Sequence, residues 1–330
     1  MKILVTGNAG FIGFHVCKKL IERGDTVVGL DNLNNYYDAK LKKSRLKILN
    51  KITKERKAKY SFFKLDISNR KEVKKIFKKF KFDRVIHLAA QAGIRYSLRN
   101  PEVYVDSNLL GFSNIIEASY KSKVPHFVYA SSSSVYGVNS KIPFKETDNT
   151  DCPKQIYAAT KKANEVMAYS YSSLRKLKTT GLRYFTVYGP WGRPDMALFK
   201  FTKNILKNKK INLYNKGAHL RDFTFIEDAA NLTIIASDKL NKFNDNKHIP
   251  FRIFNIGNNS PLKLGRLVKI IEMILKIKSR KKFMSLQKGD MINTFSNSSK
   301  IFEKFNYKIQ ADHFKNIGKF ISWYRSYYKI

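Results

Sequence analysis

Short apolar runs alternate with longer amphipathic stretches through the first half of the chain. The apolar runs have the length of buried strands, whereas apolar positions in the longer stretches recur with the period of a helix. We therefore predict six strands, at 2–6, 26–30, 60–65, 84–88, 126–131 and about 179–186. Helices are predicted between them, at 11–23, 70–80, 102–121 and 153–175. This alternation is typical of an α/β fold with a doubly wound parallel Rossmann sheet.

The pattern loosens after residue 188. Helices are predicted near 196–207, 227–238, 263–277 and 311–327, with short strands and loops between them. We predict a Rossmann domain over 1–188 and a smaller C-terminal α/β substrate-binding region over most of 189–330, with the chain able to cross between the two. The lysine-rich segment 40–59 is interpreted as a solvated helix that follows the second strand.

The first strand leads directly into a glycine-rich turn, Gly7-Asn-Ala-Gly10-Phe-Ile-Gly13, which an amphipathic stretch follows. Strand, glycine turn and helix form the context that a dinucleotide fingerprint requires, although the spacing here is G-x-x-G-x-x-G. Glycine lets the backbone approach a pyrophosphate, and the helix N-terminus supplies N–H donors. The turn therefore predicts a dinucleotide site.

The second strand ends in Asp31, about 20 positions after the glycines. A carboxylate there can accept both ribose hydroxyls of an adenosine and would repel a 2′-phosphate, which favours NAD over NADP. Lys40, Lys42 and Lys43 lie nearby in the sequence and leave NADP open.

A phenol and an ammonium lie four residues apart in Tyr157-Ala-Ala-Thr-Lys161, on one face of a predicted helix. A nearby positive charge lowers the pKa of a phenol, and such a phenol can take a proton from a sugar hydroxyl near neutral pH. The spacing alone occurs by chance in many helices. The glycine turn gives it weight, as does the serine run 131–134, which ends a predicted strand about two dozen residues upstream.

Together these motifs resemble the extended short-chain dehydrogenase/reductase family over nearly the whole chain. Longer strings resemble one of its subgroups, the UDP-glucuronate 4-epimerases. The most specific string is residues 182–197, Leu-Arg-Tyr-Phe-Thr-Val-Tyr-Gly-Pro-Trp-Gly-Arg-Pro-Asp-Met-Ala. The resemblance implies a homodimeric isomerase that epimerises C4 of a UDP-hexuronic acid, UDP-glucuronate to UDP-galacturonate, by transient oxidation with bound NAD.

The resemblance also implies roles for individual residues. Tyr157 would be the base, Ser132 would hydrogen-bond the same sugar oxygen, and Lys161 would hold the nicotinamide ribose and keep the phenol acidic. The implied cofactor contacts are Gly7, Gly10, Phe11, Ile12, Gly13, Asp31, Asp66, Ile67, Leu88, Ala89, Ala90 and Lys161.

Four further residues are implied to bind the substrate. Thr186 and Arg193 would contact the carboxylate, Arg221 would clamp the diphosphate, and Asp290 would bind the other ribose. A 4-keto uronic acid is a β-keto acid that readily loses CO₂, so its carboxylate must be restrained, and arginine suits bidentate carboxylate binding. Gln287 stands where galactose-type epimerases place a second phosphate arginine, so that contact is in doubt.

Two other functions stay open at this point. Ser134 stands where dehydratases and decarboxylases of the family carry an acidic residue, which disfavours elimination and decarboxylation but leaves a UDP-glucose or UDP-N-acetylglucosamine 4-epimerase possible. From another class comes a non-catalytic NAD- or RNA-binding protein on a Rossmann fold. The intact set of Ser132, Tyr157 and Lys161 argues against it.

The chain of 330 residues carries a formal net charge of +39. Its basic residues are spread along the sequence without a nucleic-acid-binding motif, so we expect exposed lysines on a soluble enzyme and no specific nucleic-acid partner. Only two cysteines occur, Cys17 and Cys152, and no Cys/His cluster has metal-ligand spacing. No stretch is long and apolar enough to span a membrane, and a strand that begins at residue 2 leaves no room for a signal peptide. These features predict a cytoplasmic protein without a metal.

Assembly is predicted from two long helices, 102–121 and 153–175. They carry the apolar residues Val105, Leu109, Phe112, Ile116, Val166 and Tyr169. Paired across a two-fold axis, these helices would form a four-helix dimer interface, as in the family that the chain resembles.

Overall fold

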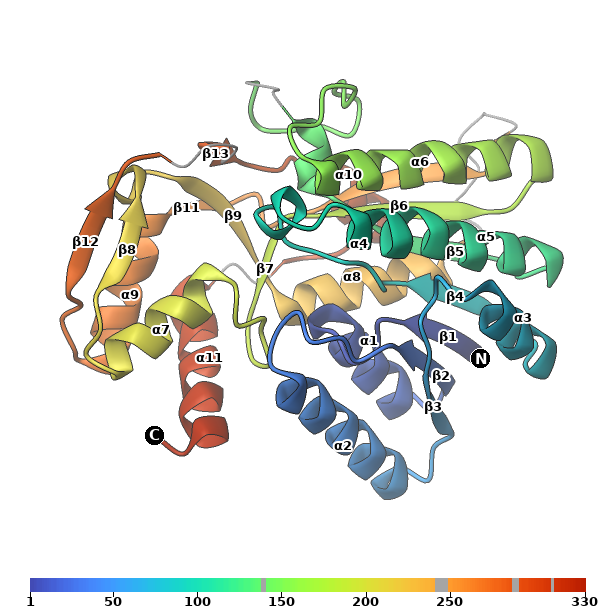
Figure 1. Cartoon of the computed structure of the whole chain (residues 1–330), viewed down its shortest axis with the longest axis horizontal. Coiled ribbons are helices and arrows are strands. Elements are labelled where there is room, and N and C mark those ends of the chain that lie inside the picture. The colour runs from blue at the N-terminus through green and yellow to red at the C-terminus, as the bar shows by residue number, and fades with distance from the viewer. Residues whose placement is uncertain (138–140, 241–248, 287–290, 310–311) are drawn as a thin grey trace.

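The computed structural model describes residues 1–137, 141–240, 249–286, 291–309 and 312–330. Figure 1 shows a large sheet with helices on both of its faces, and a smaller group of short strands and helices beside it. In the described part of the chain, no helix is long and apolar enough to cross a membrane.

The large sheet has seven strands in the order β10-β6-β5-β4-β1-β2-β3, and every neighbouring pair is parallel. Its strands are β1 (Lys2–Thr6), β2 (Thr26–Asp31), β3 (Tyr60–Lys64), β4 (Arg84–His87), β5 (Phe127–Ser132), β6 (Thr179–Tyr184) and β10 (Phe251–Ile256). All six predicted strands and the parallel Rossmann sheet are confirmed. The seventh strand comes from the C-terminal half, so both halves of the chain build the sheet, and the division at residue 188 stays a prediction.

Helices cover both faces of this sheet (Figure 1). One face carries α1 (Phe11–Glu22), α2 (Ala39–Glu55) and α8 (Ile226–Asp238), and the other carries α3 (Arg70–Lys79), α5 (Gly111–Lys121) and α6 (Ile156–Arg175). Along β1, Ile3 and Val5 pack into the core under the first group, and Leu4 packs into the core under the second. Alternate side chains point to opposite faces of a strand, so a sheet buried on both sides requires the unbroken apolar runs seen in the sequence.

The helix predicted over 102–121 is helical throughout but not uniform. It consists of α4 (Glu102–Tyr104), a π-helical stretch η2 (Val105–Leu110), and α5. The catalytic-motif helix α6 begins at Ile156, three residues later than predicted. Short 3₁₀ turns lie at η1 (Tyr96–Leu98), η3 (Ser133–Tyr136) and η4 (Asn215–Gly217).

The interpretation of 40–59 as a solvated helix is wrong for one face of α2. Leu41, Leu46 and Leu49 are buried against the sheet, as expected of an amphipathic helix. Lys42 and Arg45 are buried as well, Arg45 completely. Charge alone did not predict this, because a guanidinium can be buried when backbone carbonyl groups accept its hydrogen bonds.

The C-terminal region carries two smaller sheets. Strand β9 (Leu220–Phe225) pairs with β7 (Thr186–Tyr188), β11 (Pro261–Lys263) and β13 (Asn293–Thr294), while β8 (Ile211–Tyr214) pairs with β12 (Lys281–Met284). Helices α7 (Ala197–Leu206), α9 (Leu264–Leu275), α10 (Ser299–Phe305) and α11 (His313–Tyr328) complete it. Helices α7, α8, α9 and α11 confirm the four predicted helices of this half of the chain, and α10 was not predicted.

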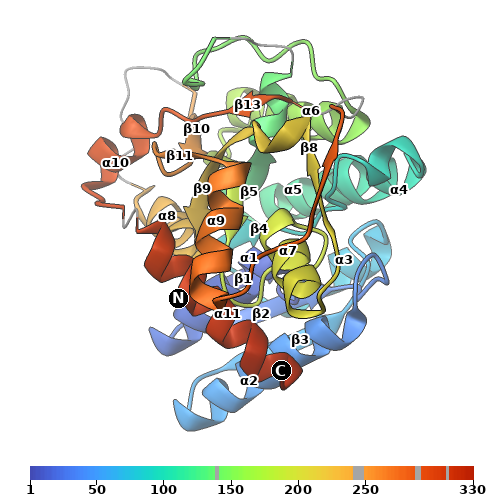
Figure 2. The same cartoon turned by 90° about the vertical axis from the view of Figure 1, so that its left-hand side faces the viewer.

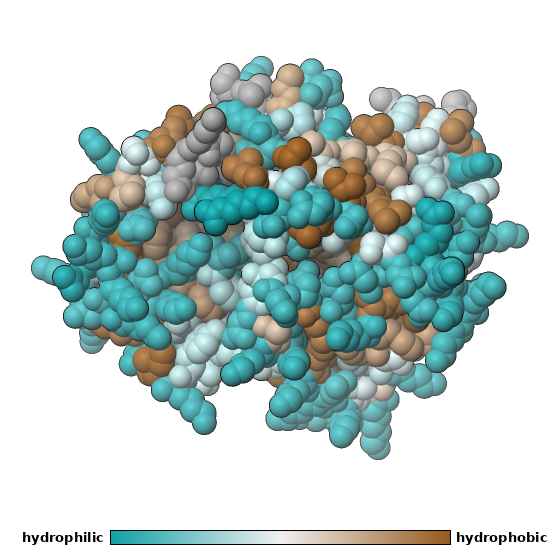
Figure 3. Space-filling model, in the orientation of Figure 1, coloured by the Kyte–Doolittle hydropathy of each residue, from teal (hydrophilic) through white to brown (hydrophobic). Residues whose placement is uncertain are grey.

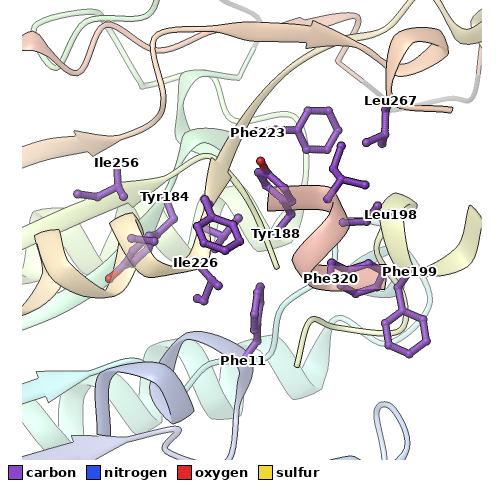
Figure 4. Packing of buried hydrophobic residues seen from close by; sticks show 14 of the residues in the cluster. Phe11, Tyr184, Tyr188, Leu198, Phe199, Phe223, Ile226, Ile256, Leu267 and Phe320 are labelled. Carbon is purple, nitrogen blue, oxygen red and sulfur yellow. The ribbon is translucent and has the colours of Figure 1, made fainter. Parts of the chain in front are cut away.

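One core joins this region to the large sheet. Phe11, at the start of α1, belongs to the same buried cluster as Tyr188, Ile226 and Phe320, and Figure 4 shows its ring pointing toward them. A second contact is visible in Figure 2, where the C-terminal end of α11 lies beside α2, and Ser44 and Tyr327 share a hydrogen bond of 3.0 Å. These contacts hold the two regions on either side of the cavity described next.

Candidate active site

A cavity of about 740 Å³ opens at the carboxyl ends of the parallel strands, where it faces the C-terminal region. The strand order reverses between β1 and β4, and ligands of doubly wound sheets bind outside the carboxyl ends of the strands at such a switch point. The cavity is lined by Gly7, Gly10, Phe11, Ile12, Gly13, Asp31, Ile67, Leu88, Ala89, Ala90, Ser132, Tyr157, Lys161, Thr186, Arg193 and Arg221. Most of the predicted site residues therefore line one and the same cavity.

The glycine turn provides the bare backbone that a dinucleotide needs. Gly7 has a φ of +71°, and a Cβ atom there would lie 2.7 Å from the backbone nitrogen of Ala89. A Cβ atom on Gly13 would lie 2.1 Å from the carbonyl oxygen of Gly7. In the described part of the chain, no side chain caps α1 at Gly10, so its first-turn N–H groups are left for ligand oxygens. This cradle fits a pyrophosphate.

Asp31, the candidate for binding the adenosine ribose, is held by the backbone. Asp31 is buried, and its carboxylate accepts hydrogen bonds from the N–H groups of Ala9 (3.2 Å) and Leu33 (2.8 Å). Burial raises the pKa of Asp31, while the ammonium of Lys42 and these two N–H groups oppose the rise. Each carboxylate oxygen keeps a further lone pair, so the geometry fits acceptance of ribose hydroxyls.

One predicted cofactor contact, Asp66, does not line the cavity. It is exposed, and its carboxylate accepts hydrogen bonds from Asn32 (2.8 Å) and from the Ser68 backbone (2.9 Å). Its neighbour Ile67 does line the cavity. Asp290 and Gln287 lie outside the described residues. The roles of these residues stay predictions.

Ser132 and Tyr157 come together from the end of β5 and the first turn of α6. The Ser132 hydroxyl is close enough to the phenol to lower its pKa, and Ser132 Oγ also lies 3.2 Å from Ser134 Oγ. Neighbouring Ser131 points the other way and donates to the buried carboxylate of Glu165 at 2.5 Å. The structure thus distinguishes two adjacent serines, and the one beside the phenol is the one that the family motif selects.

Burial and neighbouring charged groups set the pKa values of Tyr157 and Lys161. Burial raises the pKa of Tyr157, and the groups that oppose the rise are Ser132, through its hydroxyl, and the guanidinium of Arg193. Lys161 instead donates to the carbonyl oxygen of Ala130 at 2.9 Å. Burial lowers the pKa of Lys161 to about 8, although the Glu165 carboxylate opposes the change. The role of Lys161 in keeping the phenol acidic stays a prediction.

Three of the predicted substrate residues, Thr186, Arg193 and Arg221, line the same cavity. Thr186 begins β7, and Arg193 lies on the loop that leads to α7. Arg193 makes a two-point ion pair with Asp195, with Nε to Oδ1 at 3.0 Å and Nη2 to Oδ2 at 2.5 Å. Arg221 donates to the carbonyl oxygens of Met291 (2.6 Å) and Ile292 (2.8 Å). Two guanidinium groups thus line the cavity from separate segments of the C-terminal region.

Comparison with known proteins assigns the family. A model described as the NAD dependent epimerase/dehydratase family matches residues 3–257. The chain belongs to this family. Its cofactor is NAD, as the family description states and as the cradle at Gly7 fits.

Three relatives match this epimerase/dehydratase over 99–100% of its chain, beyond the residues that the family model covers. Protein CapI of Staphylococcus aureus is 45% identical over 339 residues, covering 100% of both chains. UDP-glucuronate 4-epimerase 2 of Arabidopsis thaliana is 45% identical over 100% of this chain and 77% of its own. The crystal structure of UDP-glucuronic acid 4-epimerase from Bacillus cereus, in complex with UDP-glucuronic acid and NAD, superposes with a TM-score of 0.89. It is 30% identical and covers 99% of this chain and 100% of its own.

Sequence reasoning missed a buried amide that connects helix α6 of this epimerase/dehydratase to the loop after β4. Asn108, in the π-helical stretch, donates to Thr160 Oγ1 and to the carbonyl oxygen of Gln91, both at 3.0 Å. It also accepts from the Gln91 N–H at 2.8 Å. A π-helical stretch often marks a functional site, but apolar periodicity and turn motifs do not predict where such a stretch forms.

A buried ion pair behind Lys161 was also missed. Arg183 on β6 donates to both oxygens of Glu165 at 2.8 Å, and each side chain is only 4% exposed. Glu165 lies one helical turn after Lys161, as Lys161 lies one turn after Tyr157. The i, i+4, i+8 spacing was the signal that could have found it, because all three groups share one face of α6.

Proposed function

We propose that this protein is a UDP-glucuronate 4-epimerase that interconverts UDP-glucuronate and UDP-galacturonate. The observation that carries the proposal is the position of Arg193. It lines the same cavity as Tyr157, and its charge acts on the pKa of that phenol. A cation in this place provides a partner for the carboxylate of a hexuronic acid whose C4 hydroxyl meets the phenol.

The proton chemistry is assigned to Tyr157 and Ser132. When bound, NAD would supply a reversible hydride acceptor for C4 of the sugar, so that a transient 4-ketone could form. Tyr157 receives the proton of the C4 hydroxyl and later gives it back. Ser132, whose hydroxyl lowers the pKa of the phenol, would hold the same sugar oxygen. Lys161 would hold a ribose hydroxyl with the ammonium that now meets Ala130.

Arg193 and Thr186 would hold the carboxylate. The oxidised uronate is a β-keto acid, which loses CO₂ when the bond between C5 and C6 lies parallel to the carbonyl π system. A guanidinium binds a carboxylate through two parallel hydrogen bonds and so restricts its rotation. Arg221 would bind the diphosphate at the far end of the cavity.

The experiment is an assay without added cofactor. Protein purified from expression is incubated separately with UDP-glucuronate and UDP-glucose, and the products are identified by mass and by sugar composition. We expect UDP-galacturonate from the first and much less UDP-galactose from the second. NAD, not NADP, should be released on denaturation, and Asp31→Ala should retain less of it. Faster turnover of UDP-glucose than of UDP-glucuronate would instead indicate a UDP-glucose 4-epimerase.

A second copy of the chain is the proposed partner in solution. Val105, Leu110, Val166 and Tyr169 are each at least 40% exposed. Figure 3 shows hydrophobic residues gathered over the α4 to α6 helices on one face. Two of the predicted interface residues, Phe112 and Ile116, are instead fully buried in their own protomer, because α5 turns that face to the sheet. A monomer mass by light scattering at micromolar concentration would contradict the proposal.

A further inference from the structure

Arg193 does not face the cavity as a bare cation. Its Nε and Nη2 atoms are both paired with Asp195, two residues further along the loop. The phenol of Tyr36 donates to the same carboxylate at 3.1 Å. The guanidinium lies over the Tyr36 ring, 5.9 Å from its centre. Tyr36 follows β2 and Asp195 precedes α7, so this contact crosses from the cofactor half to the substrate half.

We call Asp195 and Tyr36, which hold Arg193 in place, the bracket. It is mostly sheltered from solvent, because the Arg193 and Asp195 side chains are 22% and 27% exposed. Burial alone would raise the pKa of Asp195, but the Arg193 guanidinium and the Tyr36 hydroxyl hold it below its usual value. Burial and Asp195 together raise the pKa of Tyr36 to about 12, so its hydroxyl stays a donor. Lys200 also faces Asp195 from α7. The carboxylate therefore stays ionised and held between partners.

The shape of a guanidinium decides what a second carboxylate can do. It carries five N–H donors, arranged so that a carboxylate can bind either along the edge of Nε and one Nη or along the edge of the two Nη atoms. Asp195 occupies the first edge. A substrate that displaced Asp195 would leave a sheltered carboxylate without its partner, which is costly. The edge that includes Nη1 is thus the one available to a substrate.

We propose that Asp195, anchored by Tyr36, is a positioning residue that fixes Arg193 so that its second edge grips the carboxylate of the substrate. The inference rests on the proposed function and deepens it, because it assigns uronate selectivity to the pair and not to Arg193 alone. It follows that the substrate carboxylate binds beside Asp195 and does not replace it. Loss of the bracket leaves Arg193 in place but free to rotate, so the carboxylate is held less well.

The test compares wild-type holoenzyme with Asp195→Asn and Tyr36→Phe. The first readout is the affinity for UDP-glucuronate relative to UDP-glucose, measured by calorimetry. We expect Asp195→Asn to lower this ratio about tenfold, the scale of one hydrogen bond to a charged group, and Tyr36→Phe to lower it less. The second readout is the product of UDP-glucuronate turnover. When the bond between C5 and C6 breaks, CO₂ leaves and the electron pair of that bond forms the enolate of the 4-ketone. C5 of the enolate then takes a proton. The mass of a UDP-4-ketopentose or of a UDP-pentose should therefore appear.

A matched control and a double variant separate positioning from general damage. Asp238 pairs with Arg23 on the surface, is also 27% exposed and does not line the cavity, so Asp238→Asn should change neither readout. If Asp195 acts through Arg193, then Asp195→Asn should add nothing to the loss of selectivity caused by Arg193→Ala.

Several outcomes would overturn the inference. They are an unchanged affinity ratio in Asp195→Asn, an equal loss for both nucleotides, losses that add to that of Arg193→Ala, or tighter binding of UDP-glucuronate. Tighter binding would show that the substrate displaces Asp195. Failure of the proposed function has a different signature, which is a wild-type enzyme that forms no UDP-galacturonate. The affinity ratio tests Asp195 in that case as well.

Discussion

Arg45 Nη1 donates a hydrogen bond of 2.8 Å to the carbonyl oxygen of Ala9, inside the glycine turn. Its Nη2 atom donates to the carbonyl oxygen of Trp191 at 2.6 Å, two residues before Arg193. The side chain is fully buried. One guanidinium of α2 therefore ties the cofactor turn to the loop that carries the carboxylate-binding candidate.

Replacing Arg45 should loosen both loops. Arg45→Met leaves two buried carbonyl groups without their partner, at about 1–3 kcal/mol each, so we expect the free energy of unfolding to fall by roughly 3 kcal/mol. The variant should also lose bound NAD during gel filtration. Urea unfolding and the absorbance of released nucleotide measure the two effects. Lys47→Met, an exposed position on the same helix, is the control and should change neither.

The base is tested by removing one oxygen atom. Tyr157→Phe should fold, retain NAD and lose turnover by on the order of a hundredfold or more, the range for a general base. Turnover is measured with UDP-glucuronate, and NAD content is measured on the denatured protein. Near-normal turnover in a variant with full NAD content would exclude Tyr157 as the proton acceptor.

The carboxylate site is tested by a comparison of substrates. Arg193→Ala should cost roughly 1.5–3 kcal/mol in kcat/KM for UDP-glucuronate, the scale of a hydrogen bond between charged groups, and less for UDP-glucose. Part of the uronate should leave as a decarboxylated pentose product, detected by mass. Arg193→Lys should rescue poorly, because a point charge does not reproduce the planar fork. Equal losses on both substrates would indicate a structural role.

Acid should destabilise the fold through a buried histidine below the cofactor site. His87 Nδ1 lies 2.8 Å from Thr6 Oγ1, and burial together with the charge of Lys161 lowers the pKa of His87 from 6.5 to about 3. Between these values the unfolded chain binds a proton that the folded chain does not. The free energy of unfolding therefore falls as pH falls, by up to about 1.4 kcal/mol per pH unit for this residue.

Urea unfolding between about pH 7 and 5 tests this dependence, because most carboxylates stay ionised there. We expect His87→Gln to remove part of the slope, since glutamine has no proton to gain. An identical slope in the variant and the wild type would show that His87 is not kept neutral by the fold.

Local sequence determined the framework of this protein. Strands β1 to β6 were predicted because a parallel sheet covered on both faces needs short unbroken apolar runs. The glycine turn was predicted from its place between a strand and a helix, and in the structure a Cβ atom at Gly7 or Gly13 would collide with backbone. The candidates Tyr157 and Lys161 followed from the i, i+4 geometry of a helix. Each of these inferences depends on neighbours in the sequence.

Tertiary structure decided what depends on partners that lie far apart in the chain. Strand β10 completes the Rossmann sheet because β6 offers it an open edge, which no local pattern records. Arg45 is buried because carbonyl groups from two distant loops meet at its guanidinium. Tyr36 reaches Asp195 across 159 residues of sequence. Hydrogen bonds and charges act over a few ångströms in space, so the environment of each site residue was set only when the folded chain brought its two halves together.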